Sequence, residues 1–205
     1  MNQPKIKNVI FDIGNVLVRW SPLEIVKLTF GEQVDTTEYA KRIFFSDLWQ
    51  QLNKGELTES QAKLAYQQQL AFSFQQVEAL FYYIKETQIQ IYGMQALLKT
   101  VKDTGYNVYA LTDNVIEIVE TLQQRYDFWP LFDGAIISAE VGCLKPNPDI
   151  YHCLLTRYQL TANECVFIDD VLKNIEGAQH VGLYGIHFEN VDQCRLALNE
   201  LGVMV

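Results

Sequence analysis

The chain has 205 residues, of which 49% are hydrophobic and 20% are charged, and its formal net charge is -9. This composition is typical of a folded globular protein and argues against disorder, because disordered chains combine low hydrophobicity with high charge. The acidic balance, without a stripe of Lys and Arg, argues against nucleic-acid binding, which needs clustered positive charge. The length suits one core domain with a smaller accessory module.

No stretch of the sequence approaches the roughly 18 consecutive apolar residues of a membrane span, and the opening "MNQPKIKNV" lacks the apolar run of a signal peptide. We therefore predict a cytoplasmic protein that binds no membrane. The cysteines show no paired spacing and do not combine with histidines in a zinc pattern, so we interpret them as reduced thiols. Both a monomer and a homodimer are compatible with the sequence.

The first predicted strand covers residues 8–13, "NVIFDI", and the segment that follows it has a different character. Between residues 22 and 87 there is no convincing strand. Two capping boxes, Thr58 with Gln61 and Ser73 with Gln76, indicate that helices begin there. We predict that residues 21–87 form an all-helical cap, inserted into a core made of residues 1–20 and 88–205.

From residue 93 onward, short apolar runs alternate with amphipathic helical patterns, which is typical of a parallel sheet covered by helices on both faces. The predicted strands are residues 106–112, 135–139, 164–169 and 184–188, and helical patterns at 94–101, 115–126 and 148–158 separate them. Together with residues 8–13 they make five strands. The predicted fold class is therefore α/β, a Rossmann-like, doubly wound parallel sheet.

Polar residues follow the predicted strands at the points where the strands end. These residues are Asp12, Thr112, Asp113, Asp169 and Asp170, and Lys145 lies in the loop after strand 135–139. Because the carboxyl ends of parallel strands meet at one edge of the sheet, we expect these side chains to converge on one site.

Carboxylates crowded in this way raise one another's pKa unless a cation lies among them. Mg²⁺ is such a cation, since it binds one or two carboxylates, water and the phosphate of a substrate. Lys145 would neutralise an incoming phosphate, and the Thr112 hydroxyl would hold another phosphate oxygen. Asp12 would then serve as a nucleophile that forms an aspartyl phosphate.

Four segments, taken together, resemble the motifs of the haloacid dehalogenase superfamily over essentially the whole chain. They are "VIFDIGNVLV", "VYALTDN", "GCLKPNPDIY" and "VFIDDVLKNIEGA". The opening Phe-Asp-x-Gly-Asn-Val also resembles the branch of glucose-1-phosphate phosphatase-like proteins. The resemblance implies a Mg²⁺-dependent phosphatase, acting on a small phosphate ester such as a sugar phosphate, whose helical cap sets specificity.

The resemblance also implies a role for individual residues. Asp12 and Lys145 would be catalytic, and Thr112, Asp113 and Lys145 would bind the substrate phosphate, although the Asp113 charge is unfavourable there unless it points away. The metal ligands would be Asp12, Asp169, Asp170 and the backbone carbonyl of Gly14. Asn174 would support the loop that carries the acid pair.

Gly14 departs from the pattern of most phosphatases in the superfamily, which carry a second Asp there as general acid and base. Taken alone, "Asp-x-Gly" is also typical of a turn in which glycine adopts a positive φ. Two alternatives to an active phosphatase therefore stay open. One is a 2-haloacid dehalogenase, which needs no proton donor and no metal, although Asp169 and Asp170 argue against it. The other is a phosphate-binding protein without turnover.

Three aromatic residues near the predicted cap, Trp20, Phe45 and Trp49, are interpreted as packing residues before any role at the substrate.

Overall fold

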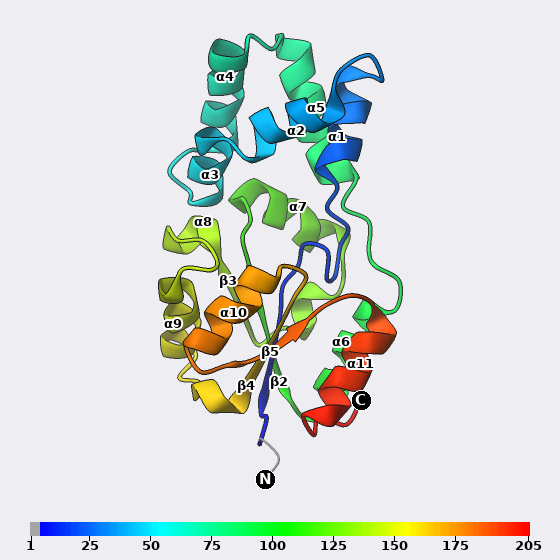
Figure 1. Cartoon of the computed structure of the whole chain (residues 1–205), viewed down its shortest axis with the longest axis vertical. Coiled ribbons are helices and arrows are strands. Elements are labelled where there is room, and N and C mark those ends of the chain that lie inside the picture. Colours follow the sequence, from blue (N-terminus) through cyan, green and yellow to red (C-terminus); the bar gives the residue numbers. More distant parts are fainter. Residues whose placement is uncertain (1–4) are drawn as a thin grey trace.

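A computed structural model of the protein describes residues 5–205 and contains one parallel five-stranded sheet in the order β3-β2-β1-β4-β5 (Figure 1). The first four residues of the predicted core lie outside the described residues. The strands are β1 (Asn8–Phe11), β2 (Asn107–Thr112), β3 (Gly134–Ile137), β4 (Cys165–Asp169) and β5 (Tyr184–His187). All five predicted strands are present, which confirms the predicted fold class.

Helices cover both faces of this sheet because successive strand residues point to opposite sides. Val9 and Phe11 belong to a buried cluster with residues of α6 (Met94–Asp103), α7 (Ile116–Arg125) and α11 (Val191–Glu200). Ile10 belongs to a second cluster with residues of α9 (Pro148–Arg157) and α10 (Leu172–His180). The remaining elements of this part are α8 (Ser138–Val141) and the short 3-10 helices η1 (Trp129–Leu131) and η2 (Ala162–Glu164).

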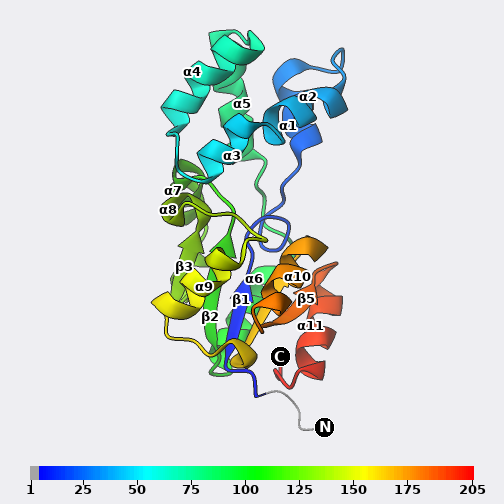
Figure 2. The ribbon, with the colours of Figure 1, turned by 60° about the vertical axis from the view of Figure 1, so that its left-hand side comes forward.

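Residues 22–86, which we call the helical insertion, lie between β1 and β2 in the chain and beyond the carboxyl ends of the strands in space (Figures 1 and 2). The insertion contains α1 (Pro22–Phe30), α2 (Thr36–Phe44), α3 (Asp47–Asn53), α4 (Glu59–Leu70) and α5 (Phe74–Glu86). Both expected capping boxes are formed, at the starts of α4 and α5. The packing role expected for Phe45 is wrong, since this residue is 74% exposed.

The insertion rests directly on α8, the short helix that follows β3. Ser138 donates a hydrogen bond from Oγ to the carbonyl oxygen of Asn53 at 2.6 Å. Gly55 has a φ of 69°, in the left-handed region that favours glycine, and a Cβ atom there would lie 2.1 Å from the carbonyl oxygen of Ala139. A side chain at residue 55 would therefore push the insertion away from the core.

Within residues 5–205, none of the helices combines the length and the apolar character that crossing a membrane requires.

Candidate active site

The sheet register brings Asp12 and Asp169 to the same edge. Phe11 of β1 lies opposite Ile168 of β4, and the backbone N–H of Asp12 donates to the carbonyl oxygen of Ile168 at 2.9 Å. Asp169 is the last residue of β4 and is fully buried. Two acids that are 157 residues apart in sequence are therefore neighbours at the carboxyl ends of adjacent strands, as the pattern of strand ends predicted.

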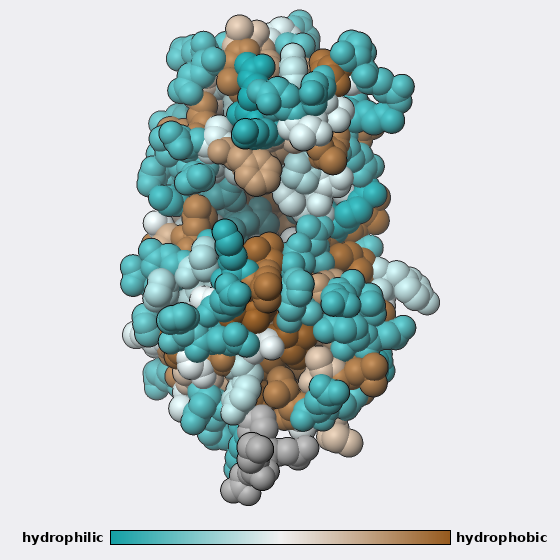
Figure 3. Space-filling view, viewed as in Figure 1, coloured by the Kyte–Doolittle hydropathy of each residue, from teal (hydrophilic) through white to brown (hydrophobic). Residues whose placement is uncertain are grey.

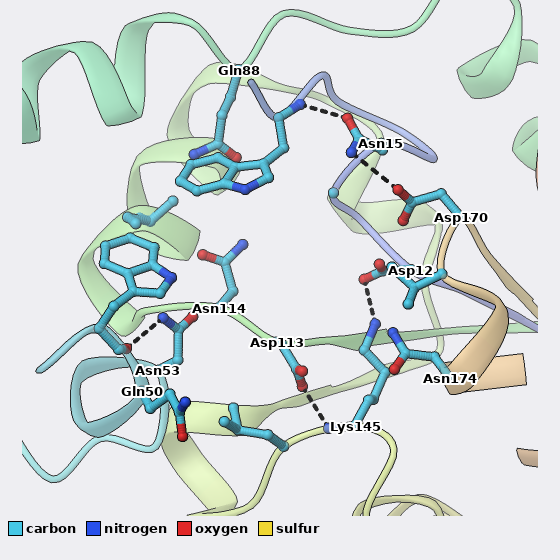
Figure 4. A pocket seen from close by; sticks show the side chains of 16 residues that line it. Asp12, Asn15, Gln50, Asn53, Gln88, Asp113, Asn114, Lys145, Asp170 and Asn174 are labelled. Carbon is cyan, nitrogen blue, oxygen red and sulfur yellow. Dashed lines mark hydrogen bonds and ion pairs between the residues drawn. The ribbon is translucent and has the colours of Figure 1, made fainter. Parts of the chain in front are cut away.

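Lys145 bridges these two acids. Its Nζ atom lies 2.9 Å from Oδ1 of Asp12 and 2.7 Å from Oδ2 of Asp169, and only 2% of its side chain is exposed. Figure 4 shows the ammonium group directed toward Asp12. A buried lysine paired with two carboxylates retains its charge, because the two negative charges stabilise the ammonium group in the interior.

Three contacts fix the loop that carries Lys145. Oδ1 of Asp113 accepts a hydrogen bond from the backbone N–H of Lys145 at 3.0 Å. On the other side, Gly177 of α10 comes so close that a Cβ atom would lie 2.8 Å from the carbonyl oxygen of Pro146. Asn147 then caps α9 by accepting from the N–H of Asp149, as the Asn-Pro sequence predicted. Backbone contacts thus hold this lysine in place.

Burial and neighbouring charges shift the pKa values of the site. Burial raises the pKa of Asp12 above its usual value, and the charge of Lys145 opposes this effect. Burial lowers the pKa of the Lys145 ammonium group. The charges of Asp12 and Asp169 outweigh burial, so the pKa of Lys145 lies above its usual value. Burial also raises the pKa of Asp113 and of Asp170. The lysine is therefore the fixed positive charge of the site.

Three carboxylates could hold a metal ion together. One oxygen from each of Asp12, Asp169 and Asp170 lies within 4.8 Å of the others. Asn174 supports this cluster by donating from Nδ2 to both oxygens of Asp169 at 3.1 Å. Carboxylate oxygens are the ligands that Mg²⁺ prefers, and three of them so close together need a cation beyond one lysine, so the donor set fits a magnesium ion.

Gly14 does not form the left-handed turn that the pattern suggested. Its φ lies outside the positive range, and Asn15 has the positive φ instead, at 51°. The Asn15 side chain donates to Oδ2 of Asp170 at 3.0 Å and accepts from the N–H of Trp20 at 2.8 Å. A Cβ atom on Gly14 would meet no atom within 4 Å. Backbone sterics therefore do not explain the absence of an acid at this position.

A cavity of about 290 Å³ opens over these residues, between the sheet and the helical insertion. Figure 3 shows a hollow in this region of the surface. Of the predicted site residues, Asp12, Gly14, Asp113, Lys145, Asp170 and Asn174 line the cavity. Thr112 ends β2 with 1% exposure, and neither it nor Asp169 belongs to the lining.

Further lining residues lie outside the four motifs. Trp49, Gln50 and Asn53 come from α3 of the insertion, whereas Trp20 and Gln88 come from the two segments that join the insertion to the core. The positions of these five residues depend on how the insertion packs, so a pattern read along the chain gives no signal for them. Asn114 also lines the cavity, but it follows β2 and ends the motif "VYALTDN". The packing role expected for Trp20 and Trp49 is correct but incomplete, because both indoles also face the cavity.

A doubly wound parallel sheet that gathers carboxylates and a buried lysine at the ends of its strands defines an α/β enzyme. The sequence model of the haloacid dehalogenase-like hydrolases matches residues 6–182, so the chain belongs to this family of hydrolases.

Two characterised relatives align along most of the chain. Sesquiterpene phosphatase astK of Aspergillus oryzae is 30% identical over 88% of this chain and 89% of its own length. Flavin mononucleotide hydrolase 1 of Arabidopsis thaliana is 26% identical over 98% of this chain and 80% of its own length. Among solved structures, a HAD family enzyme of Bacteroides thetaiotaomicron, in complex with magnesium and inorganic phosphate, has a TM-score of 0.73. The two structures share 20% sequence identity over 90% of this chain and 95% of that chain, and the similarity concerns the fold alone.

Proposed function

We propose that the protein is a Mg²⁺-dependent phosphomonoester hydrolase that works through an aspartyl phosphate at Asp12. The observation that carries the proposal is the 2.9 Å contact between Lys145 and Asp12, which is one of three carboxylates that could hold a cation together. The names of the two relatives, a sesquiterpene phosphatase and a flavin mononucleotide hydrolase, support phosphate-ester chemistry. The magnesium and phosphate in the Bacteroides structure also agree with it.

In the proposed mechanism a carboxylate oxygen of Asp12 attacks the phosphorus atom, and the bond from phosphorus to the ester oxygen breaks. The alcohol leaves and takes a proton from solvent, because Gly14 offers none. Water then attacks the phosphorus of the aspartyl phosphate, releases inorganic phosphate and restores the carboxylate. Lys145 neutralises charge on the phosphoryl group in both steps, with the Thr112 hydroxyl as a further proposed phosphate contact.

Asp12, Asp169, Asp170 and the carbonyl oxygen of Gly14 would hold the magnesium ion. A bound Mg²⁺ supplies positive charge that stabilises the phosphate oxygens as they become more negative. For Asp113 the structure supports a second proposal beside the predicted phosphate contact, since one of its oxygens accepts from the Lys145 backbone. We propose that Asp113 positions the Lys145 loop.

The helical insertion is the proposed cap, because α3 supplies three residues of the cavity that contains Asp12. A boundary after residue 20 and another after residue 87 stay a prediction, as do a monomeric or dimeric state and a place in the cytoplasm. The sugar phosphate expected from the branch resemblance is likewise a hypothesis about the substrate.

Phosphate release from a panel of sugar phosphates, including glucose 1-phosphate, tests the function. We expect release that needs Mg²⁺, stops with a chelator and is lost in Asp12→Asn. Halide release from 2-haloacids that ignores the chelator would instead indicate a dehalogenase. Binding of inorganic phosphate without turnover of any ester would indicate the non-catalytic alternative.

A further inference from the structure

We infer that the leaving group of the substrate is a small uncharged alcohol that carries a ring, with the ring against the tryptophan pair and its hydroxyl or N–H groups on a set of buried carboxamides. This inference rests on the proposed phosphatase function and adds the substrate class. Three independent features of the cavity lead to it: its aromatic wall, its unpaired amide groups and its charge.

The aromatic wall is formed by Trp20 and Trp49. Their rings stack with centroids 5.7 Å apart and planes at 13° to each other. Phe44 contacts both indoles edge-on, at 5.3 Å and 5.1 Å, which fixes their orientation. Both tryptophans are half-buried and line the cavity. Because the two indoles stack on each other, the cavity meets their remaining surfaces, and a fixed apolar wall of this kind favours the apolar face of a ring.

Three carboxamides offer polar groups without a protein partner. Asn53, Gln88 and Asn114 are each at least nine-tenths buried and line the cavity. One end of each amide bonds the backbone: Nδ2 of Asn53 donates to Trp49 at 2.8 Å, Nε2 of Gln88 donates to Ile84 at 2.9 Å, and Oδ1 of Asn114 accepts from Val115 at 2.9 Å.

The other ends have no partner among residues 5–205. They are Oδ1 of Asn53, Oε1 of Gln88 and Nδ2 of Asn114, and Figure 4 shows these side chains across the cavity from Asp12 and Lys145. These three atoms have no hydrogen-bond partner but are not fully enclosed, so they face the cavity and are available to a ligand or to water. Two acceptors and one donor match an alcohol that bears hydroxyl or N–H groups.

The charge of the cavity excludes a second anion on the leaving group. Among the lining residues only Lys145 is a cation, and it already pairs with Asp12 and Asp169. A carboxylate or second phosphate on the leaving group would lose its hydration without gaining a counter-charge, and it would lie near several acids. The volume of about 290 Å³ lies at the low end for ligand cavities, which favours a small leaving group.

Matched substrates that differ by one anionic group test the inference. We expect kcat/KM for glucose 1-phosphate to exceed that for glucuronic acid 1-phosphate by roughly tenfold or more, because the carboxylate finds no cation. Ribose 5-phosphate should likewise exceed ribose 1,5-bisphosphate. Equal rates within each pair, or a preference for the charged member, would overturn the inference.

Variants of the wall and of one carboxamide give a second readout. Trp49→Leu and Asn114→Asp should each raise KM for the uncharged ester more than they lower kcat, whereas Tyr92→Leu, which changes a 97% exposed aromatic residue, should alter neither. A KM unchanged in both cavity variants would contradict the inference. Acetyl phosphate separates this failure from failure of the proposed function. If the enzyme releases no phosphate from it in the presence of Mg²⁺, the proposed phosphatase function is itself contradicted.

Discussion

The backbone N–H of Lys145 donates to a carboxylate oxygen of Asp113 across 3.0 Å. An acid that directly follows a predicted phosphate-binding threonine therefore serves the loop that carries the lysine. Burial raises the pKa of Asp113, whereas the Lys145 charge and this hydrogen bond lower it again. The contact links the end of β2 to the loop between α8 and α9, and it explains how an extra carboxylate is tolerated beside the proposed phosphate site.

Replacing Asp113 by Ala removes the acceptor for the Lys145 N–H. We expect kcat/KM to fall by roughly fivefold, since one hydrogen bond contributes about 1 kcal/mol. Asp113→Asn is the matched control, because its amide oxygen still accepts from Lys145 while the charge is gone. Steady-state kinetics on one phosphate ester would measure both variants. Equal losses in Ala and Asn would show that the charge matters and not the hydrogen bond.

Gly14→Asp introduces the second acid that most phosphatases of the superfamily carry at this position. Open space around Gly14 means that the variant should fold with an unchanged melting temperature. We expect kcat to rise, by up to roughly a hundredfold, for an alkyl phosphate whose leaving group needs a proton. p-Nitrophenyl phosphate, whose leaving group needs none, should gain little. Gly14→Ala controls for the added Cβ, and a lower kcat for both substrates in Gly14→Asp alone would mean that the site is built around glycine.

Asn15 holds Asp170, a proposed magnesium ligand, by a 3.0 Å hydrogen bond. Asn15→Gly keeps the positive φ but removes this bond, so we expect Mg²⁺ to bind roughly tenfold more weakly or worse, as is usual when support for a metal ligand is lost. Titration calorimetry with Mg²⁺ measures the effect. Gln61→Ala, at the start of α4 and outside the cavity, should bind Mg²⁺ like the wild type. Unchanged affinity in Asn15→Gly would remove Asp170 from the ligand set.

Magnesium affinity should increase with pH. Burial raises the pKa values of Asp12 and Asp170, so these carboxylates hold protons to a higher pH than free aspartate does. Only the deprotonated forms bind the metal, and a rise in pH therefore tightens binding, approaching roughly tenfold per pH unit where one proton is released. Affinities measured between pH 6 and pH 8 test this. Asp12→Asn should show a weaker dependence, and an affinity that falls with rising pH would contradict the assignment.

Local patterns in the sequence predicted the fold of the protein and the meeting of its strand-end residues. The alternation of apolar runs and helical stripes gave all five strands, and capping boxes at Thr58 and Ser73 gave the starts of two helices. Because parallel strands share one polarity, strand ends alone predict that Asp12 and Asp169 meet, and the loop position of Lys145 predicts that it joins them. That Lys145 lies between the two acids is seen only in the structure. The predicted features depend on short segments and on a topology that has few alternatives.

The cavity wall could not be predicted in this way. Gln88 and Asn53 reach the cavity only because the helical insertion packs against α8, the helix after β3. This contact joins segments that are far apart in the chain. Asn15 takes the positive φ that glycine would normally take, and no residue preference assigns that conformation to Asn15 when a glycine precedes it. Tertiary packing therefore decides which residues of the insertion line the cavity.

Trapping the intermediate tests the central claim most directly. The enzyme is quenched during turnover of acetyl phosphate or of an active ester and reduced with borohydride, which converts an aspartyl phosphate to homoserine, and its peptides are then analysed by mass spectrometry. The account predicts homoserine at residue 12 in the presence of Mg²⁺, with neither label nor turnover in Asp12→Asn. Turnover that survives in Asp12→Asn, or a label on another residue, would contradict it.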